Sequence, residues 1–185
     1  MHDTRDQLFS IHRLVWIALM AALTAAGALV SIPVAFISPV PISLQTMFVL
    51  LSGLILGPRG GALAVLLYIA AGCLGLPVFA GGKSGLASFL GPTGGFLAGF
   101  LPAAVCCGFA KRVPVRPYPA LVLYCAVATA ITLVIGTAHM AITLNISVHT
   151  ALAGGVFLFL PGEILKCFGA AFIYRFLAVR RLVPA

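Results

Sequence analysis

The sequence predicts an all-α integral membrane protein, a single membrane domain over residues 1–185 with about six transmembrane helices and irregular extracytoplasmic loops. Hydrophobic residues make up 62% of the chain and charged residues 8%, whereas a soluble domain is about half apolar. The mean hydropathy is +1.20. The apolar residues fall into separate runs bounded by glycine, proline and charge, which is typical of successive membrane spans.

Spanning segments are expected at residues 12–31, 44–57, 60–76, 94–112, 118–144 and 157–180. The second and third are shorter than the ~20 residues that a crossing helix needs. The residues between them, Gly57 to Gly61 (G-P-R-G-G), predict a tight turn without continuous helix. We expect the first run to be a retained helix rather than a removed signal peptide, with residues 1–11 as a cytoplasmic tail.

Basic residues gather on one side of this predicted topology. With six crossings, that side would carry Arg5, Arg13, Arg59, Lys111, Arg112, Arg116, Arg180 and Arg181. The opposite side would carry Lys83. Under the positive-inside rule, this asymmetry places both termini in the cytoplasm. The basic residues are scattered at segment ends and form no stripe with exposed aromatics, so we expect no nucleic-acid partner.

Two irregular loops, Pro33–Pro41 and Pro77–Gly95, fall on the outer side. Three prolines in the first loop prevent regular helix. The second loop has six glycines and is too apolar to extend freely into water. Irregular backbone near a membrane is tolerated where it packs on protein or lines a cavity. We interpret both loops as lids over a pocket that opens to the outside.

Glu163 and Lys166 are the leading candidates for ligand binding. The chain has three acidic residues, and the other two, Asp3 and Asp6, lie in the tail. An ionisable group inside a membrane is costly unless it is paired or hydrated, so it is a functional candidate. At i and i+3 the two side chains share a helix face, expected in the first turns of the last helix. The alternative is a self-neutralised pair that only fixes helix packing.

Three further residues are candidate ligand contacts. Gln45 opens the second helix, and its amide offers a donor and an acceptor that suit a cyclic urea or amide; the alternative is that it caps this short helix. Gly82 and Lys83 lie in the second loop, where Lys83 is either a ligand cation or a solvated lysine. The spacing of the glycines around them does not fit an ATP-binding phosphate loop.

Ala18, Ala22 and Ala26 repeat at every fourth position of the first helix. Small residues at this spacing form a flat face that another membrane helix can approach closely. The sequence leaves two interpretations open, which are packing within this chain and docking of another membrane subunit.

The sequence offers little for catalysis, cofactors or metals. The five cysteines lie in apolar stretches, and we interpret them as buried free thiols. His139, Asn145 and His149 have no acidic partner nearby, so we expect no metal site. One acid with one lysine rarely suffices for chemistry, so we expect no enzymatic activity.

Five sequence blocks resemble the BioY family, the biotin-binding S components of energy-coupling factor (ECF) transporters. They occur in order from Pro39 to Thr46 (P-V-P-I-S-L-Q-T), Gly57 to Ala62 (G-P-R-G-G-A), Gly75 to Gly82 (G-L-P-V-F-A-G-G), Gly91 to Gly95 (G-P-T-G-G) and Pro161 to Lys166 (P-G-E-I-L-K). The resemblance runs from about residue 12 to 180. In the family the last block usually reads Pro-Gly-Asp, so Glu163 adds one methylene at this position.

The resemblance implies biotin uptake through a six-helix S-component fold in a bacterial or archaeal cell membrane. Biotin would bind on the extracytoplasmic side beneath the two loops. The partners would be a transmembrane T subunit, docked on the alanine face, and two ATPases, since this chain has no nucleotide motif. Rival interpretations are a stand-alone secondary transporter of a small carboxylate vitamin, an intramembrane enzyme and a purely structural protein.

Overall fold

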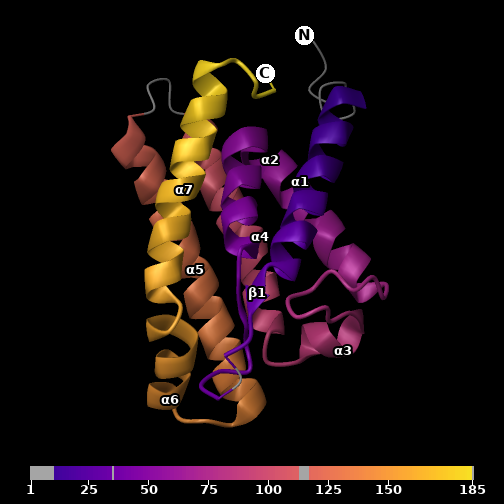
Figure 1. Cartoon of the computed structure of the whole chain (residues 1–185), viewed down its shortest axis with the longest axis vertical. Coiled ribbons are helices and arrows are strands. Elements are labelled where there is room, and N and C mark those ends of the chain that lie inside the picture. Colours follow the sequence, from indigo (N-terminus) through magenta and orange to yellow (C-terminus); the bar gives the residue numbers. More distant parts are fainter. Residues whose placement is uncertain (1–10, 35, 113–116, 185) are drawn as a thin grey trace.

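The computed structural model describes residues 11–34, 36–112 and 117–184, so Arg5, Arg116 and most of the expected tail lie outside the described residues. Figure 1 shows an elongated helical bundle with short elements at one end. In chain order the elements are α1 (Ile11–Leu29), β1 (Ser31–Ile32), β2 (Ile42–Ser43), α2 (Gln45–Cys73), α3 (Gly85–Leu90), α4 (Gly94–Gly108), η1 (Phe109–Arg112), α5 (Tyr118–Leu144), α6 (Val148–Leu152), η2 (Ala153–Phe157) and α7 (Leu160–Val179). The predicted helical fold is confirmed.

The helix α2 contains a sharp reversal at Gly57. This residue has φ 76° and ψ −177°, a conformation that glycine adopts readily, and Pro58 then restarts the helix. A Cβ added to Gly61 would lie 2.8 Å from the Cα of Gly53. Residues 53 and 61 would be ~12 Å apart in a straight helix, so the two arms fold back on each other. The predicted break is confirmed, but it occupies one residue rather than five.

In the described part of the chain, five helical stretches are long and apolar enough to cross a membrane. They are Ile11–Leu29, Gln45–Cys73, Gly94–Lys111, Tyr118–Leu144 and Val148–Val179. The second stretch holds the two arms of α2, so the five stretches supply the six predicted segments. The last stretch begins before the predicted segment, because α6 and the π-helical turn η2 lead into α7.

Glycines allow α4 to pack directly on the reversal of α2. A Cβ at Gly108 would lie 2.3 Å from the backbone nitrogen of Pro58. A Cβ at Gly53 would lie 2.4 Å from the carbonyl oxygen of Ala104. Side chains cannot fit at such distances, so these glycines set how closely the helices approach.

The chain segments with most of the basic residues meet at one end of the bundle. Figure 1 places the start of α1, the start of α5 and the end of α7 at this end. The Nζ of Lys111 donates to the carbonyl oxygen of Pro184 at 3.0 Å. Lys111 also lies beside Gly57, and the side chain of Arg13 lies beside Gly60. The predicted grouping of these residues therefore holds for those that the structure describes.

The opposite end carries both predicted loops. The first loop connects the two strands of a short antiparallel ribbon, β1 and β2, in which Ser31 pairs with Ser43 and Ile32 with Ile42. The second contains the short helix α3 and a tight turn in which the N–H of Phe79 donates to the carbonyl oxygen of Lys83 at 3.0 Å. This part of the chain is thus more ordered than the sequence predicted, because strand pairing flanks the first loop and a short helix lies within the second.

Candidate functional site

A cavity lies between the two loops and the helices beneath them, with a water-accessible volume of about 50 Å³. The first loop contributes Val40 and Pro41, and the second contributes Phe79 and Ala80. The predicted pairing of both loops over one pocket is therefore present in the structure. The remaining lining residues come from β2 and helices α2, α4, α5 and α7, and from the segments just before α4 and α7.

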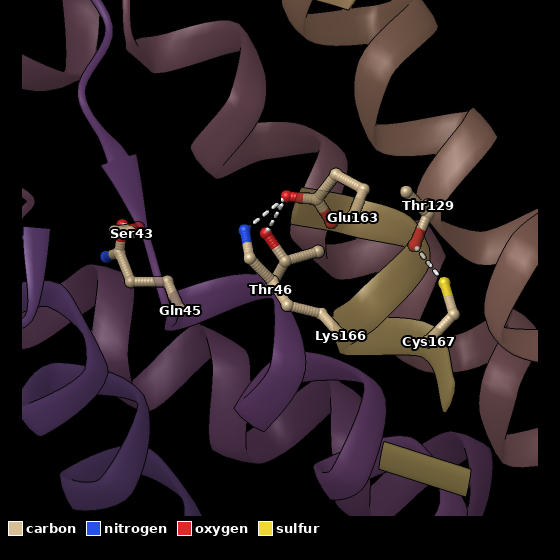
Figure 2. A network of polar contacts seen from close by, with 7 residues as sticks. All are labelled: Ser43, Gln45, Thr46, Thr129, Glu163, Lys166 and Cys167. Carbon is tan, nitrogen blue, oxygen red and sulfur yellow. Dashed lines mark hydrogen bonds and ion pairs between the residues drawn. The ribbon is translucent and has the colours of Figure 1, made fainter. Parts of the chain in front are cut away.

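Glu163 and Lys166 form a buried ion pair in the wall of this cavity. The Lys166 Nζ lies 2.5 Å from the Glu163 Oε1, and the two residues are 7% and 4% exposed. Thr46, at the start of α2, donates its hydroxyl to the same oxygen at 3.1 Å. Figure 2 shows Lys166 and Thr46 converging on this one carboxylate oxygen. The pair lies in the first turns of α7, as the sequence predicted.

The other carboxylate oxygen of Glu163, Oε2, is buried and has no hydrogen-bond partner among the described residues. A buried acceptor without a donor costs about 1–3 kcal/mol, and more when it is charged. Lys166 keeps spare donor capacity, because an ammonium group has three N–H bonds. The pair therefore keeps one unused acceptor, the Glu163 Oε2, and unused N–H donors on Lys166.

The walls around the pair are largely apolar and aromatic. Phe79, Phe96, Phe100 and Phe159 line the cavity, and the rings of Phe96 and Phe159 have centroids 6.0 Å apart. The sequence analysis did not single out these rings. These phenylalanines lie near the loops and near the start of α4 and α7. In the sequence alone they look the same as phenylalanines of an ordinary hydrophobic core.

Gln45 lines the cavity, but both ends of its amide are already bonded. The hydroxyl of Ser43 donates to the Gln45 Oε1 at 2.9 Å, and the Gln45 Nε2 donates to the hydroxyl of Tyr68. Leu44 holds the capping position of α2 without a side-chain cap bond, so Gln45 is not a cap. Its predicted contact with a ligand would require one of these bonds to be exchanged.

Lys83 and Gly82 do not line the cavity. Both are exposed in the turn that precedes α3, where the N–H of Gly82 donates to the carbonyl oxygen of Phe79 at 3.0 Å. Gly81 and Gly82 have φ angles of 75° and 72°, which close the turn. The turn instead directs Phe79 and Ala80 to the cavity, so the sequence prediction identified the correct loop but not its inward residues.

A profile of the BioY family matches residues 2–185. The chain belongs to the BioY family. It is 36% identical over 187 residues to the biotin transporter BioY of Rhizobium etli, a match that covers 95% of this chain and 98% of that protein. It is 47% identical to the probable biotin transporter BioY of Pyrococcus horikoshii over 95 residues, which is 51% of this chain and 57% of that protein.

The fold is also similar to that of a solved structure. A crystal structure of the S-component for biotin from an ECF-type ABC transporter matches with a TM-score of 0.84 and 29% sequence identity. The match covers 96% of this chain and 95% of that chain. The predicted S-component fold is therefore confirmed, and the chain is a multi-pass membrane protein.

In this member of the BioY family, the alanine face of α1 points away from the bundle. Ala18, Ala22 and Ala26 are exposed, whereas the neighbouring Ala21 and Ala28 are buried. The interpretation that the three alanines pack within this chain is therefore wrong. A flat outer face at this place is open to lipid or to another membrane protein.

Removing one charge of the Glu163–Lys166 pair should destabilise the protein more than removing both. Lys166→Met leaves a buried carboxylate without its ammonium partner. Glu163→Gln leaves the buried Lys166 ammonium without its carboxylate partner. Breaking a buried pair in this way costs about 3–5 kcal/mol. In thermal unfolding of the ligand-free chain in detergent, the double variant should have a higher unfolding temperature than each single variant.

Lys83→Met is the matched control, because it removes an exposed lysine and should leave the unfolding temperature unchanged. If the double variant unfolds as early as the two single variants, the charges do not stabilise each other.

Proposed function

We propose that this chain is a biotin-binding S component that takes part in biotin uptake through an ECF-type ABC transporter. Its relatives carry the name biotin transporter BioY, and its fold matches that of an S-component for biotin. The observation that carries the proposal is the buried Glu163 Oε2 without a partner, beside Lys166, in a cavity under two loops. The site offers ligand contacts but no second acid or nucleophile, so we propose no catalytic role.

Biotin has hydrogen-bond donors and acceptors that would complement the unused acceptor of Glu163 and the unused donors of Lys166. Its ureido ring has two N–H donors and a carbonyl acceptor, and its valerate chain ends in a carboxylate. The Glu163 Oε2 would accept from a ureido N–H, and Lys166 would donate to the ureido oxygen or to the carboxylate. The apolar ring and chain of biotin would contact the aromatic walls formed by Phe79, Phe96 and Phe159. Both charges of the pair then stay satisfied when the ligand enters.

The partners that we propose are a transmembrane T subunit and two ATPase subunits, with the surrounding lipid bilayer. The three alanines of α1 support the first of these, because an exposed face of small residues permits close helix contact. The orientation that we propose has both termini in the cytoplasm and Lys83 outside, in a bacterial or archaeal cell membrane. Arg13, Lys111 and Arg180 lie at the cytoplasmic end in this orientation, which agrees with the positive-inside rule.

Charge-removing changes at the pair should weaken biotin binding while the protein remains folded. Removing one partner leaves the other buried and unpaired, a loss of about 2–5 kcal/mol at such sites. Glu163→Gln and Lys166→Met should therefore each lower the affinity by a factor of tens or more in a calorimetric titration. Glu163→Asp should be far milder, because it keeps the charge.

Lys83→Met again serves as the control and should change the affinity less than about twofold, since the side chain lies outside the cavity. A large loss in this variant would restore Lys83 as a ligand contact. Wild-type affinity in both charge-removing variants would show that the pair is structural and that the proposed site is wrong.

Replacing Ala22 with Trp should reduce biotin uptake and leave biotin binding in detergent nearly intact. A large side chain would separate the helices at the alanine face, while the cavity is built from other elements. Val134→Trp is a suitable control, because it places the same bulk on an exposed position of α5. Unimpaired uptake by Ala22→Trp would count against docking and favour the stand-alone transporter.

A cysteine at position 83 should react with an impermeant thiol reagent added outside intact cells. The experiment uses a background without native cysteines, and Arg180→Cys is the control at the other end of the bundle. Position 180 should react only after the cells are lysed. Both residues are exposed, but Lys83 lies just before α3 and Arg180 just after α7, and Figure 1 shows α3 and the end of α7 at opposite ends of the bundle. Labelling of position 83 only after lysis would reverse the proposed orientation.

A further inference from the structure

Two cysteine thiols meet in the interface between α4 and α5. The Sγ atoms of Cys107 and Cys125 are 3.9 Å apart, and both residues are 0% exposed. They are free thiols rather than a disulfide. Neither residue lines the cavity, so the pair has no part in the proposed function.

The surroundings of the two thiols are apolar and tightly packed. Cys107 and Cys125 belong to the main hydrophobic core, together with small residues such as Ala103 and Ala128. On the side of α2, a Cβ added to Gly53 would lie 2.8 Å from the Cβ of Cys107. A thiolate alone would be costly in such a place, because burying a charge is unfavourable unless an opposite charge pairs with it.

These surroundings restrict the kind of metal ion that the pair could hold. Thiolates are soft ligands and prefer soft metal ions. In the described part of the chain, no group of three or more His, Cys, Asp or Glu could hold a metal, so an ion would have only the two sulfurs as protein ligands. Two thiolates and a divalent ion are neutral together, whereas a monovalent ion such as Cu⁺ would leave a buried negative charge. A soft divalent ion that accepts two ligands, such as Hg²⁺, fits both conditions.

The distance between the sulfurs favours insertion of a metal ion over formation of a disulfide. Metal–thiolate bonds of about 2.3 Å place two sulfurs on opposite sides of an ion about 4.6 Å apart. From 3.9 Å, the sulfurs of Cys107 and Cys125 would move apart by about 0.7 Å. A disulfide would bring them about 1.9 Å closer. In a tightly packed core the smaller movement is the easier one.

An open groove on the outer face of α4 gives a route to the pair from the lipid. The groove is apolar, has a water-accessible volume of about 410 Å³, and is lined by Leu101, Pro102, Val105, Cys106 and Phe109. It lies on a stretch that is long and apolar enough to cross a membrane. Cys106 packs against the same core that contains Cys107 and Cys125. A neutral metal compound dissolved in the lipid can therefore approach the two thiols from this side.

We propose that Cys107 and Cys125 form a two-thiolate site for a soft divalent metal ion of the Hg²⁺ class, which enters from the lipid at the groove beside Cys106. With mercuric chloride, two S–Hg bonds form and two Hg–Cl bonds break, and the two thiol protons leave with the chlorides as HCl. No atom changes its oxidation state. The bound ion would join α4 to α5 one helical turn from Thr129, which lines the cavity.

The test compares two variants with the same number of thiols, each purified in the reduced state in detergent. The pair variant keeps Cys107 and Cys125 and has alanine at the other three cysteines. The matched control keeps Cys107 and Cys73, which lie near the ends of α4 and α2 at opposite ends of the bundle. After addition of one equivalent of mercuric chloride, intact mass spectrometry should show that the pair variant has gained one mercury, lost two hydrogens and retained no chloride. The control should retain a chloride on the mercury or form a link between two chains.

Competition with a monothiol such as mercaptoethanol measures how strongly each variant holds the ion. The pair variant should keep its mercury up to a competitor concentration about a hundredfold higher than the control, because the second thiol is present at a high effective concentration. Zn²⁺ should not bind to the pair variant, since a structural zinc ion needs four ligands.

The unmodified chain tests the site without any substitution. After treatment with mercuric chloride, peptide mass spectrometry should find the peptides of Cys107 and Cys125 joined through mercury. In sealed membrane vesicles, a sulfonated organomercurial that cannot cross lipid should leave both thiols free, whereas mercuric chloride should occupy them.

The two-thiolate site is overturned if the pair variant and the control release mercury at the same competitor concentration. It is also overturned if the pair variant loses two hydrogens without gaining mercury, because the thiols have then formed a disulfide. Equal reaction of both thiols with the sulfonated reagent and with mercuric chloride would overturn entry from the lipid. None of these outcomes depends on whether biotin is the ligand of the cavity.

Discussion

A carboxylate inside an apolar bundle must find partners, and this requirement shapes the structure around α7. Lys166 neutralises Glu163 from one helical turn away, and Thr46 adds a donor from α2. These contacts use only one carboxylate oxygen, so the helix bundle holds the charge while the other oxygen, Oε2, stays buried without a hydrogen-bond partner among the described residues. In the function that we propose, stability and ligand recognition draw on the same side chain, since a fully satisfied carboxylate would have little to offer a ligand.

The position of the second loop at the same end as Thr46 depends on the reversal at Gly57. Because the first arm of α2 ends there and the second arm returns, the start of α2 and the second loop lie at the same end of the bundle. Glycine contacts with α4 make this reversal compact. The turn, at the other end of the bundle, thus returns the chain so that Phe79 and Ala80 of the second loop can line the cavity.

Two polar networks with different properties lie at the loop end of the bundle. The charged network lies on α7 and α2 and offers free hydrogen-bonding capacity to the cavity. The neutral network of Ser43, Gln45 and Tyr68 is internally satisfied and joins the second loop, through the carbonyl oxygen of Val78, to α2 and β2. The sequence analysis singled out Glu163, Lys166 and Gln45 as candidates, but not Ser43 or Tyr68. The partners across the bundle could not be predicted, because Thr46 and Glu163 are 117 positions apart and Gln45 and Tyr68 are 23 apart.

The sequence by itself determined the membrane-protein class, the spans, the break near Gly57, the two loops and the Glu163–Lys166 pair. These features follow from local composition and from i to i+3 spacing, which a single segment carries without its neighbours. Only the tertiary structure decided that Phe79 rather than Lys83 faces the cavity, that Gln45 is bonded to Tyr68, and that the alanine face points outward. Such outcomes depend on which helices pack together, because burial and long-range hydrogen bonds are properties of the assembled bundle and not of any one segment.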